Sequence, residues 1–135
     1  MDRSSQSPML YALLGVALLV TVLVHLSVLP RYYPGDLFMT ALTLVVGWLT
    51  FAIVWYLTGR IYSTPGELPT MRSADIGLGL FLVSLLIALF MDSMGFTPET
   101  VLEAFVLPAI GIYVGLALLG WSIGRRTKAI NRISS

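Results

Sequence analysis

The chain has 135 residues, of which 57% are hydrophobic and only 11% are charged, and its mean hydropathy is +0.89. A soluble domain carries about 25% charged residues, so the composition excludes a soluble globular protein and indicates an integral membrane protein that binds no nucleic acid. The absence of cysteine excludes disulfides, thiolate metal sites and iron–sulfur clusters.

Four apolar runs make up most of the length. A helix needs about 20 apolar residues to cross about 30 Å of hydrocarbon, and each run, extended at its ends, reaches this length. The connection between the second and third runs is too short to hold a separate core. The sequence therefore predicts an all-α fold, a single domain over residues 1–135. Its four transmembrane helices form two hairpins, with spans at about 9–29, 37–58, 75–94 and 101–123 and a basic tail at 124–135.

Several residues mark where the helices should begin and end. We expect Asp36 to cap the second helix and Ser73 to cap the third, because short polar side chains accept bonds from the first free N–H groups of a helix. Gly95 can take the left-handed conformation that stops the third helix. Thr97 and Pro98 predict the start of the fourth helix, as its cap and its first residue.

The basic residues predict the orientation. Seven of the eight Lys and Arg residues lie before the first span, between the second and third, or after the fourth, whereas Arg31 is alone on the other side. The positive-inside rule places both termini in the cytoplasm of a multi-pass protein of the inner or plasma membrane. The basic tail is also a candidate site for lipid head groups, through Arg125, Arg126, Lys128 and Arg132.

The fourth span carries the best candidate packing surface. At about 100° per residue, one narrow stripe collects small residues and a proline, while bulky side chains such as Tyr113 and Leu116 lie on the far side. Small residues let helices approach closely in lipid, so we expect another helix to fill this stripe and a second-span face with Thr40, Thr43 and Gly47 to pack similarly. The members of the stripe are Ala104, Pro108, Gly111, Gly115 and Ser122.

His25 is the only histidine and lies about one turn below the outer end of the first span. Ionisable groups at that depth are functional candidates by default. It is the one candidate cofactor-binding residue, either as an axial haem ligand or as a hydrogen-bonding group for a quinone. Two other hypotheses are a proton relay and a structural hydrogen bond between helices. A haem held by two histidines needs a second one, which this chain lacks. We expect the structural role, with no bound cofactor, no metal site and no catalytic residue.

A weak internal repeat relates the two halves. Each half is two spans, so the halves would have the same orientation and be related by an axis along the membrane normal. Chance matching of glycine and proline remains the alternative. A shift of 64 aligns Gly15 with Gly79, Pro34 with Pro98 and Gly47 with Gly111, and a shift of 65 aligns Gly59-Arg60 with Gly124-Arg125.

These features predict a non-catalytic accessory subunit of a larger membrane complex, with a respiratory or photosynthetic electron-transfer assembly as the first host to consider. Its expected partners are other integral membrane subunits and membrane lipids, with a quinone nearby in the host. One alternative is a homo-oligomeric transporter or channel for small molecules or ions. Another is a structural membrane protein of a virus or a cell envelope.

Overall fold

The computed structural model describes residues 3–33, 35–64, 68–98 and 100–134, and its regular elements there are all helical. Four helices are long and apolar enough to cross a membrane, which confirms the all-α, four-span prediction. These spans are Pro8–Tyr32, Leu37–Tyr62, Arg72–Ser93 and Leu102–Ile133.

The first span is built from three consecutive helical segments: α1 (Arg3–Leu23), the π-helical turn η1 (Val24–Val28) and α2 (Leu29–Tyr32). The sequence predicted an end at Leu29-Pro30, but the span continues past the proline. A proline ring clashes with the carbonyl four residues earlier in an α-helix. Here that carbonyl belongs to the π turn, where the wider backbone lets the N–H of Leu29 bond to the oxygen of Val24. The π turn thus accommodates Pro30 and contains His25.

The second span is the single helix α3 (Leu37–Tyr62). The carboxylate of Asp36 accepts a bond from the N–H of Met39 at 3.1 Å, so the predicted cap is confirmed. The helix runs four residues beyond the predicted end of the span, to Tyr62.

The third span, α4 (Arg72–Ser93), differs from the prediction at its start and agrees at its end. Met71 occupies the cap position without a side-chain bond, and Ser73 lies inside the helix, so the predicted Ser73 cap is wrong. Gly95 has φ of +94°, the left-handed conformation predicted for the residue that stops this helix.

The fourth span is α5 (Leu102–Ser134), a continuous helix of 33 residues. The predicted start at Thr97-Pro98 is wrong, because the carbonyl of Thr97 accepts from the N–H groups of Thr100 and Val101 in a separate turn. Glu99 lies outside the described residues. The other end also differs from the prediction: the basic segment at 124–134 continues the same helix instead of forming a separate tail.

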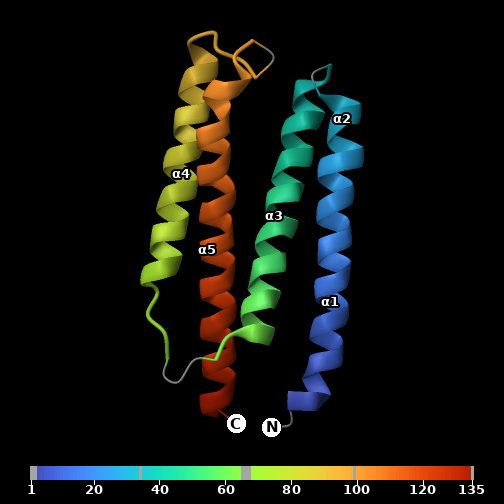
Figure 1. The fold of residues 1–135 in the computed structure, drawn as a ribbon, viewed down its shortest axis with the longest axis vertical. Coiled ribbons are helices and arrows are strands. Elements are labelled where there is room, and N and C mark those ends of the chain that lie inside the picture. The colour runs from blue at the N-terminus through green and yellow to red at the C-terminus, as the bar shows by residue number, and fades with distance from the viewer. Residues whose placement is uncertain (1–2, 34, 65–67, 99, 135) are drawn as a thin grey trace.

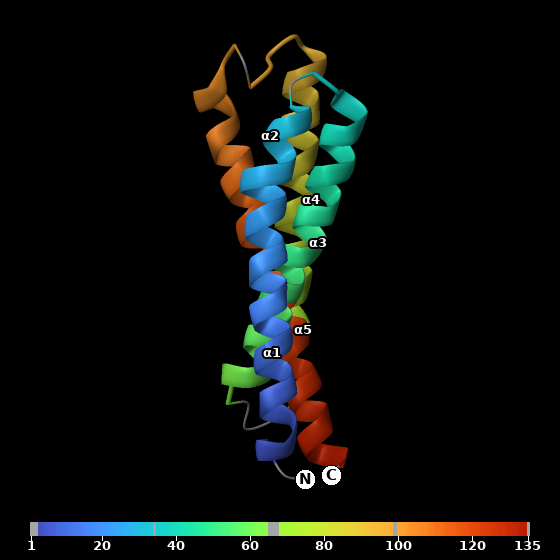
Figure 2. The same cartoon turned by 90° about the vertical axis from the view of Figure 1, so that its right-hand side faces the viewer.

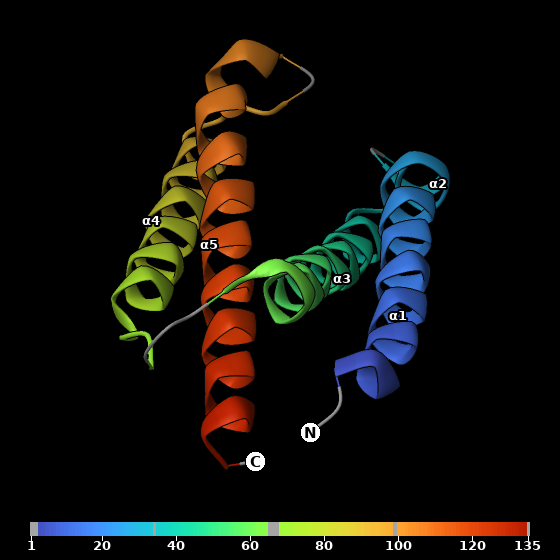
Figure 3. The same cartoon turned by 60° about the horizontal axis from the view of Figure 1, so that its bottom comes forward.

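The helices lie in the order α4, α5, α3, α1, as an open row rather than a closed four-helix bundle (Figure 3). Helix α5 packs closely against both α4 and α3, whereas α1 packs against α3. Figure 1 shows that α1 begins and α5 ends at the same end of the molecule, and in Figure 2, along the row, α1 stands in front of the others. Two helices are therefore central, and two are peripheral.

The contact between the two central helices is reciprocal. A Cβ atom on Gly59 of α3 would lie 2.6 Å from the carbonyl oxygen of Trp121 in α5, and one on Gly124 of α5 would meet the carbonyl oxygen of Tyr56 in α3 first. A shift of 65 residues relates Gly59 to Gly124 and Tyr56 to Trp121, so it maps each of these contacts onto the other. Such exchange is what a two-fold axis between like surfaces produces, and this one contact agrees with the predicted parallel internal repeat, whereas the aligned pair Gly47 and Gly111 has different neighbours.

Candidate functional site

His25 is hydrogen-bonded through both ring nitrogens. Its Nδ1 lies 2.9 Å from the carbonyl oxygen of Thr21, and its Nε2 lies 2.6 Å from the hydroxyl oxygen of Tyr113. A carbonyl can only accept, so Nδ1 carries the hydrogen. In the neutral ring Nε2 then accepts, and the Tyr113 hydroxyl donates to it. This bond joins the first span to α5, two helices that otherwise stand apart.

The His25 ring reaches α5 because α3 has a glycine beside it. A Cβ atom on Gly47 would lie 2.7 Å from Cε1 of the ring. We call the end of the molecule opposite the basic segment its outer end. Gly47 and Tyr113 lie roughly 15 Å along their helices from this end, at 1.5 Å per residue, which is about half of a 30 Å hydrocarbon layer. His25 therefore lies further from the end of its span than the sequence indicated, since the span extends beyond Pro30 to Tyr32.

Aromatic side chains lie next to this hydrogen bond, and the contacts among them include residues from all four spans. Tyr113 stacks edge-on against Phe51 of α3 at 5.0 Å between centroids and against His25 at 5.5 Å, and Trp48 of α3 meets Phe81 of α4 at 5.5 Å. Edge-to-face pairs at such distances are favourable. The indole N–H of Trp48 is buried near the Tyr113 hydroxyl but makes no hydrogen bond of normal geometry. We call His25, Trp48, Phe51, Phe81 and Tyr113 the polar–aromatic centre.

The chemistry open to this centre is limited by its own bonds. To ligate a haem iron, His25 would have to release Tyr113 or Thr21. A quinone carbonyl could accept from the Trp48 N–H, but only after the packed rings move. Among the residues that the structure describes, no three His, Cys, Asp or Glu side chains come together as a metal site. The arrangement is thus best suited to holding helices together.

The stripe predicted on α5 faces α4 of the same chain. A Cβ atom on Gly115 would lie 2.6 Å from the carbonyl oxygen of Gly77, and one on Gly111 would meet the hydroxyl of Ser84. Ser122 is 2% exposed, and its hydroxyl has no hydrogen-bond partner. The helix that fills the stripe at Gly111, Gly115 and below is therefore part of this molecule.

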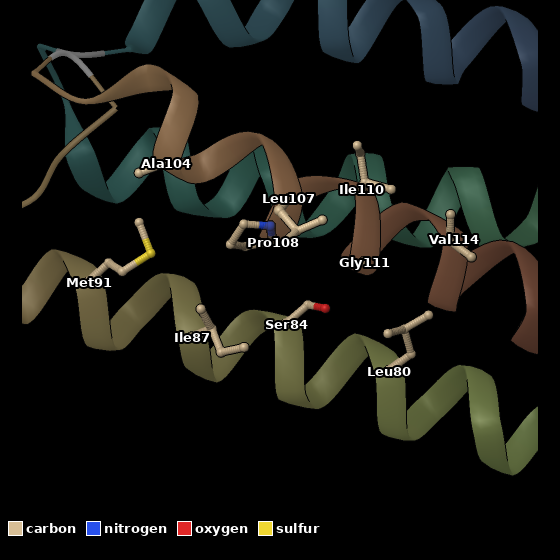
Figure 4. Close-up of a pocket in the computed structure, with 10 residues that line it drawn as sticks. All are labelled: Leu80, Ser84, Ile87, Met91, Ala104, Leu107, Pro108, Ile110, Gly111 and Val114. Carbon is tan, nitrogen blue, oxygen red and sulfur yellow. The ribbon is translucent and has the colours of Figure 1, made fainter.

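Towards the outer end, α4 and α5 separate, and a groove of about 420 Å³ opens between them. Ala104 and Pro108, the outer members of the predicted stripe, line this groove instead of contacting α4 closely. Figure 4 shows Ser84 pointing from α4 towards α5, the one polar side chain among otherwise apolar lining residues. The lining residues are Leu80, Ser84, Ile87, Met91, Ala104, Leu107, Pro108, Ile110, Gly111 and Val114.

The face predicted on the second span is also covered by the chain itself. Thr40, Thr43 and Gly47 are buried, and the close neighbours of Gly47 are His25 and Val24 from the π turn. The Thr40 hydroxyl donates to the carbonyl of Asp36 within its own helix. Neither predicted face is thus free for another subunit along its glycines.

At the basic end, two of the four candidate lipid-binding residues donate hydrogen bonds to backbone carbonyls of the same chain. Arg126 donates to the carbonyl of Pro69 at 2.6 Å, and Lys128 donates to the carbonyls of Ile61 at 3.1 Å and Ser63 at 2.5 Å. Lys128 thereby satisfies free carbonyls at the end of α3, as cations near a helix C-terminus do. Sequence reasoning missed these bonds, because they join residues more than 50 positions apart.

The other two candidates differ in burial. The Nε atom of Arg125 is buried without a hydrogen-bond partner, and Arg132 lies exposed near the end of α5. Arg132 is therefore the most accessible of the four to a lipid head group, since the other three are half-buried.

Comparison of the chain with protein families, with characterised proteins and with solved structures found no match.

Proposed function

We propose that this protein is a non-catalytic integral subunit of a larger membrane complex, packed within the bilayer against other transmembrane chains. The observation that carries the proposal is the open row of helices. A lone four-helix protein covers most helix faces when it closes into a bundle. Here the first span packs against α3 and leaves large apolar side chains uncovered, with Val16 58% exposed, Leu19 59% and Leu26 74%.

The interior of the molecule supports the same proposal. His25 is the only ionisable side chain, apart from tyrosines, in the middle of any span, and both of its nitrogens bond to the chain itself. Transporters and proton pumps use ionisable groups at this depth to bind substrates and protons. A group whose bonds are internally satisfied fits a helix-joining role better, so we assign the chain a structural part in its complex.

For the host, a respiratory or photosynthetic electron-transfer assembly remains our first candidate. Small polytopic chains with few polar groups at the membrane centre are familiar in these assemblies, where they contact catalytic subunits, lipids and quinone. The exposed face of α1 is the surface we propose for contact with the host, since the glycine faces of α3 and α5 are already filled.

Isolation from native membranes tests the proposal. The tagged protein is extracted in a mild detergent, and the co-purifying chains are identified and quantified. We expect stoichiometric recovery with other integral membrane subunits, with cytochrome or quinone-binding subunits among them. A pure homo-oligomer would instead favour a self-assembling transporter or channel, and a monomer would contradict both proposals.

The same isolation with exposed α1 residues changed locates the contact. Leu19→Trp and Val16→Trp enlarge side chains on the uncovered face and should lower recovery of partners without lowering the thermal stability of the purified chain. Leu86→Trp is the matched control on α4, because Leu86 is also exposed, at 64%. Equal losses from both helices would show that α1 is not the contact helix.

A further inference from the structure

The polar–aromatic centre holds α1 by a bond whose direction depends on the protonation of His25. From this geometry we infer that His25 and Tyr113 form a proton-sensitive latch: neutral His25 holds the outer part of the first span against α5, and protonated His25 releases it. The inference concerns the conformation of the isolated chain, so it stands or falls separately from the proposed membrane complex.

The bond pattern accounts for the latch in the neutral state. Nδ1–H donates to the Thr21 carbonyl, and Nε2 accepts from the Tyr113 hydroxyl at 2.6 Å. No other hydrogen bond is described between the first span and α5. Among the residues that the structure describes, the His25–Tyr113 bond is therefore the contact that joins these two helices.

Protonation changes Nε2 of His25 from a hydrogen-bond acceptor to a donor. A histidinium ring has hydrogens on both nitrogens, so Nε2–H would face a hydroxyl that now donates to it. The Tyr113 hydroxyl would have to turn its hydrogen away and accept, but the group beside it is the Trp48 N–H, itself a donor. No described hydrogen bond would then take up its hydrogen, and a buried unsatisfied donor is costly.

The charge itself has no partner at this depth. The described neighbours of the His25 ring are the carbonyl of Thr21 on its own helix, Gly47 on α3 and the Tyr113 side chain on α5. The rings of Phe51, Trp48 and Phe81 complete the centre. None of them is an acid. An unpaired cation in hydrocarbon favours movement towards water. The described acids all lie at the ends of helices, at Asp36, Asp75, Asp92 and Glu103.

The backbone around His25 is built in a way that permits the change. The ring lies in η1, and π turns within α-helices occur frequently at functional sites. Conversion of this turn to α-helix would bring the Pro30 ring against the carbonyl of Leu26, so the turn itself stays in place. His25 instead leaves Tyr113 by rotation about its own side-chain bonds, which keeps the span folded.

Spin-label distances in the full-length chain test the latch. Because the chain has no cysteine, Val22→Cys on α1 and Leu107→Cys on α5, both exposed, provide two unique labelling sites. The labelled protein is reconstituted in lipid nanodiscs and measured at pH 8 and at pH 5. We expect one narrow distance distribution at pH 8 and a longer, broader one at pH 5.

Two variants separate the latch from other effects of acid. His25→Gln keeps a hydrogen-bonding group but does not titrate, so its distribution should be the same at both pH values. Tyr113→Phe lacks the hydroxyl and should be broad at both. A parent distribution that does not change with pH overturns the inference, and so does a change that persists in His25→Gln or a Tyr113→Phe variant that behaves like the parent.

Discussion

The two hairpins of this protein differ in how closely their two helices pack. In the second hairpin, α4 and α5 meet backbone to backbone, with Gly77 against Gly115. In the first, α1 and α3 are held further apart, and the His25 ring fills the space beside Gly47. Helix association in lipid depends on close packing and on hydrogen bonds between helices. The hairpin of α4 and α5 relies on close packing. The hairpin of the first span and α3 combines looser packing with a hydrogen bond.

The consequence is a difference in how firmly each outer helix is attached. Helix α4 makes an extended close contact with α5, while the first span has apolar contacts with α3 and one polar contact with α5. Leu10 and Ala17 of α1 pack with Val54 and Leu57 of α3 towards the basic end. The outer half of the first span is joined to α5 through His25 and to α3 through contacts of η1 and α2.

The largest expected effect comes from the close hairpin. Changing both Gly111 and Gly115 to leucine places side chains where α4 now lies, and overpacking costs about 1–3 kcal/mol at a well-filled site. The double variant should insert normally, because leucine favours the membrane, but should melt well below the parent in detergent. The measurement is thermal unfolding followed by circular dichroism.

Leu102→Ile is the control for the double variant, since Leu102 is 64% exposed. It should melt within a degree or two of the parent. Leu116 lies on the far side of the stripe but is only 6% exposed, so it is part of the interior and unsuitable as a neutral site. A double variant that melts like the parent would show that α4 does not fill the stripe.

The central contact should respond symmetrically. Gly59→Ala places a Cβ atom 2.6 Å from the Trp121 carbonyl oxygen, and Gly124→Ala places one against Tyr56 in the equivalent position. Each should lower the free energy of unfolding by about 1–3 kcal/mol, and by similar amounts, as measured by thermal or denaturant unfolding in detergent.

Gly79→Ala serves as the control for the central contact. Nothing lies within 4 Å of a Cβ atom at Gly79, so alanine there should be neutral or stabilise the helix by up to about 1 kcal/mol. A loss confined to Gly59→Ala or to Gly124→Ala would argue against the two-fold relation between α3 and α5.

A smaller effect is expected at the polar bond of the wide hairpin. Tyr113→Phe removes the hydroxyl that donates to His25, and interhelical hydrogen bonds in membranes average about 0.6 kcal/mol. Its melting temperature at pH 8 should fall slightly, whereas His25→Gln should stay close to the parent and bind its host within a few-fold. Loss of a haem absorbance band or of quinol turnover in His25→Gln would instead indicate a cofactor role.

The topology test should leave stability unchanged and show whether both hairpins have the same orientation. Single cysteines replace Gly35 and Thr100 in the two outer turns, Thr64 in the inner connection and Ile133 near the end of α5, all at exposed positions. An impermeant thiol reagent added outside intact cells should label the first two alone. Labelling of Ile133→Cys from outside would reverse the predicted orientation.

The sequence by itself determined the four spans, because their length and hydrophobicity are local properties that the bilayer selects. It also determined the caps at Asp36 and Gly95, where one side chain or one φ angle decides. It misplaced the start of α5, since the turn at Thr97 satisfies its carbonyl with Thr100 and Val101 instead of beginning the helix. The sequence also predicted that the first span ends at Pro30, because a proline usually ends a helix and the sequence does not show the π turn that accommodates it.

Only the tertiary structure decided which surfaces meet. The periodicity of α5 indicated that Gly111 and Gly115 share a face, but the neighbour could have been any helix, in this chain or another. The structure places α4 there. In the same way, His25 was visible as an isolated ionisable group, while its partner Tyr113 is 88 residues away. Pairings of this kind depend on how helices cross and at what depth, and a single sequence read along its length does not contain that geometry.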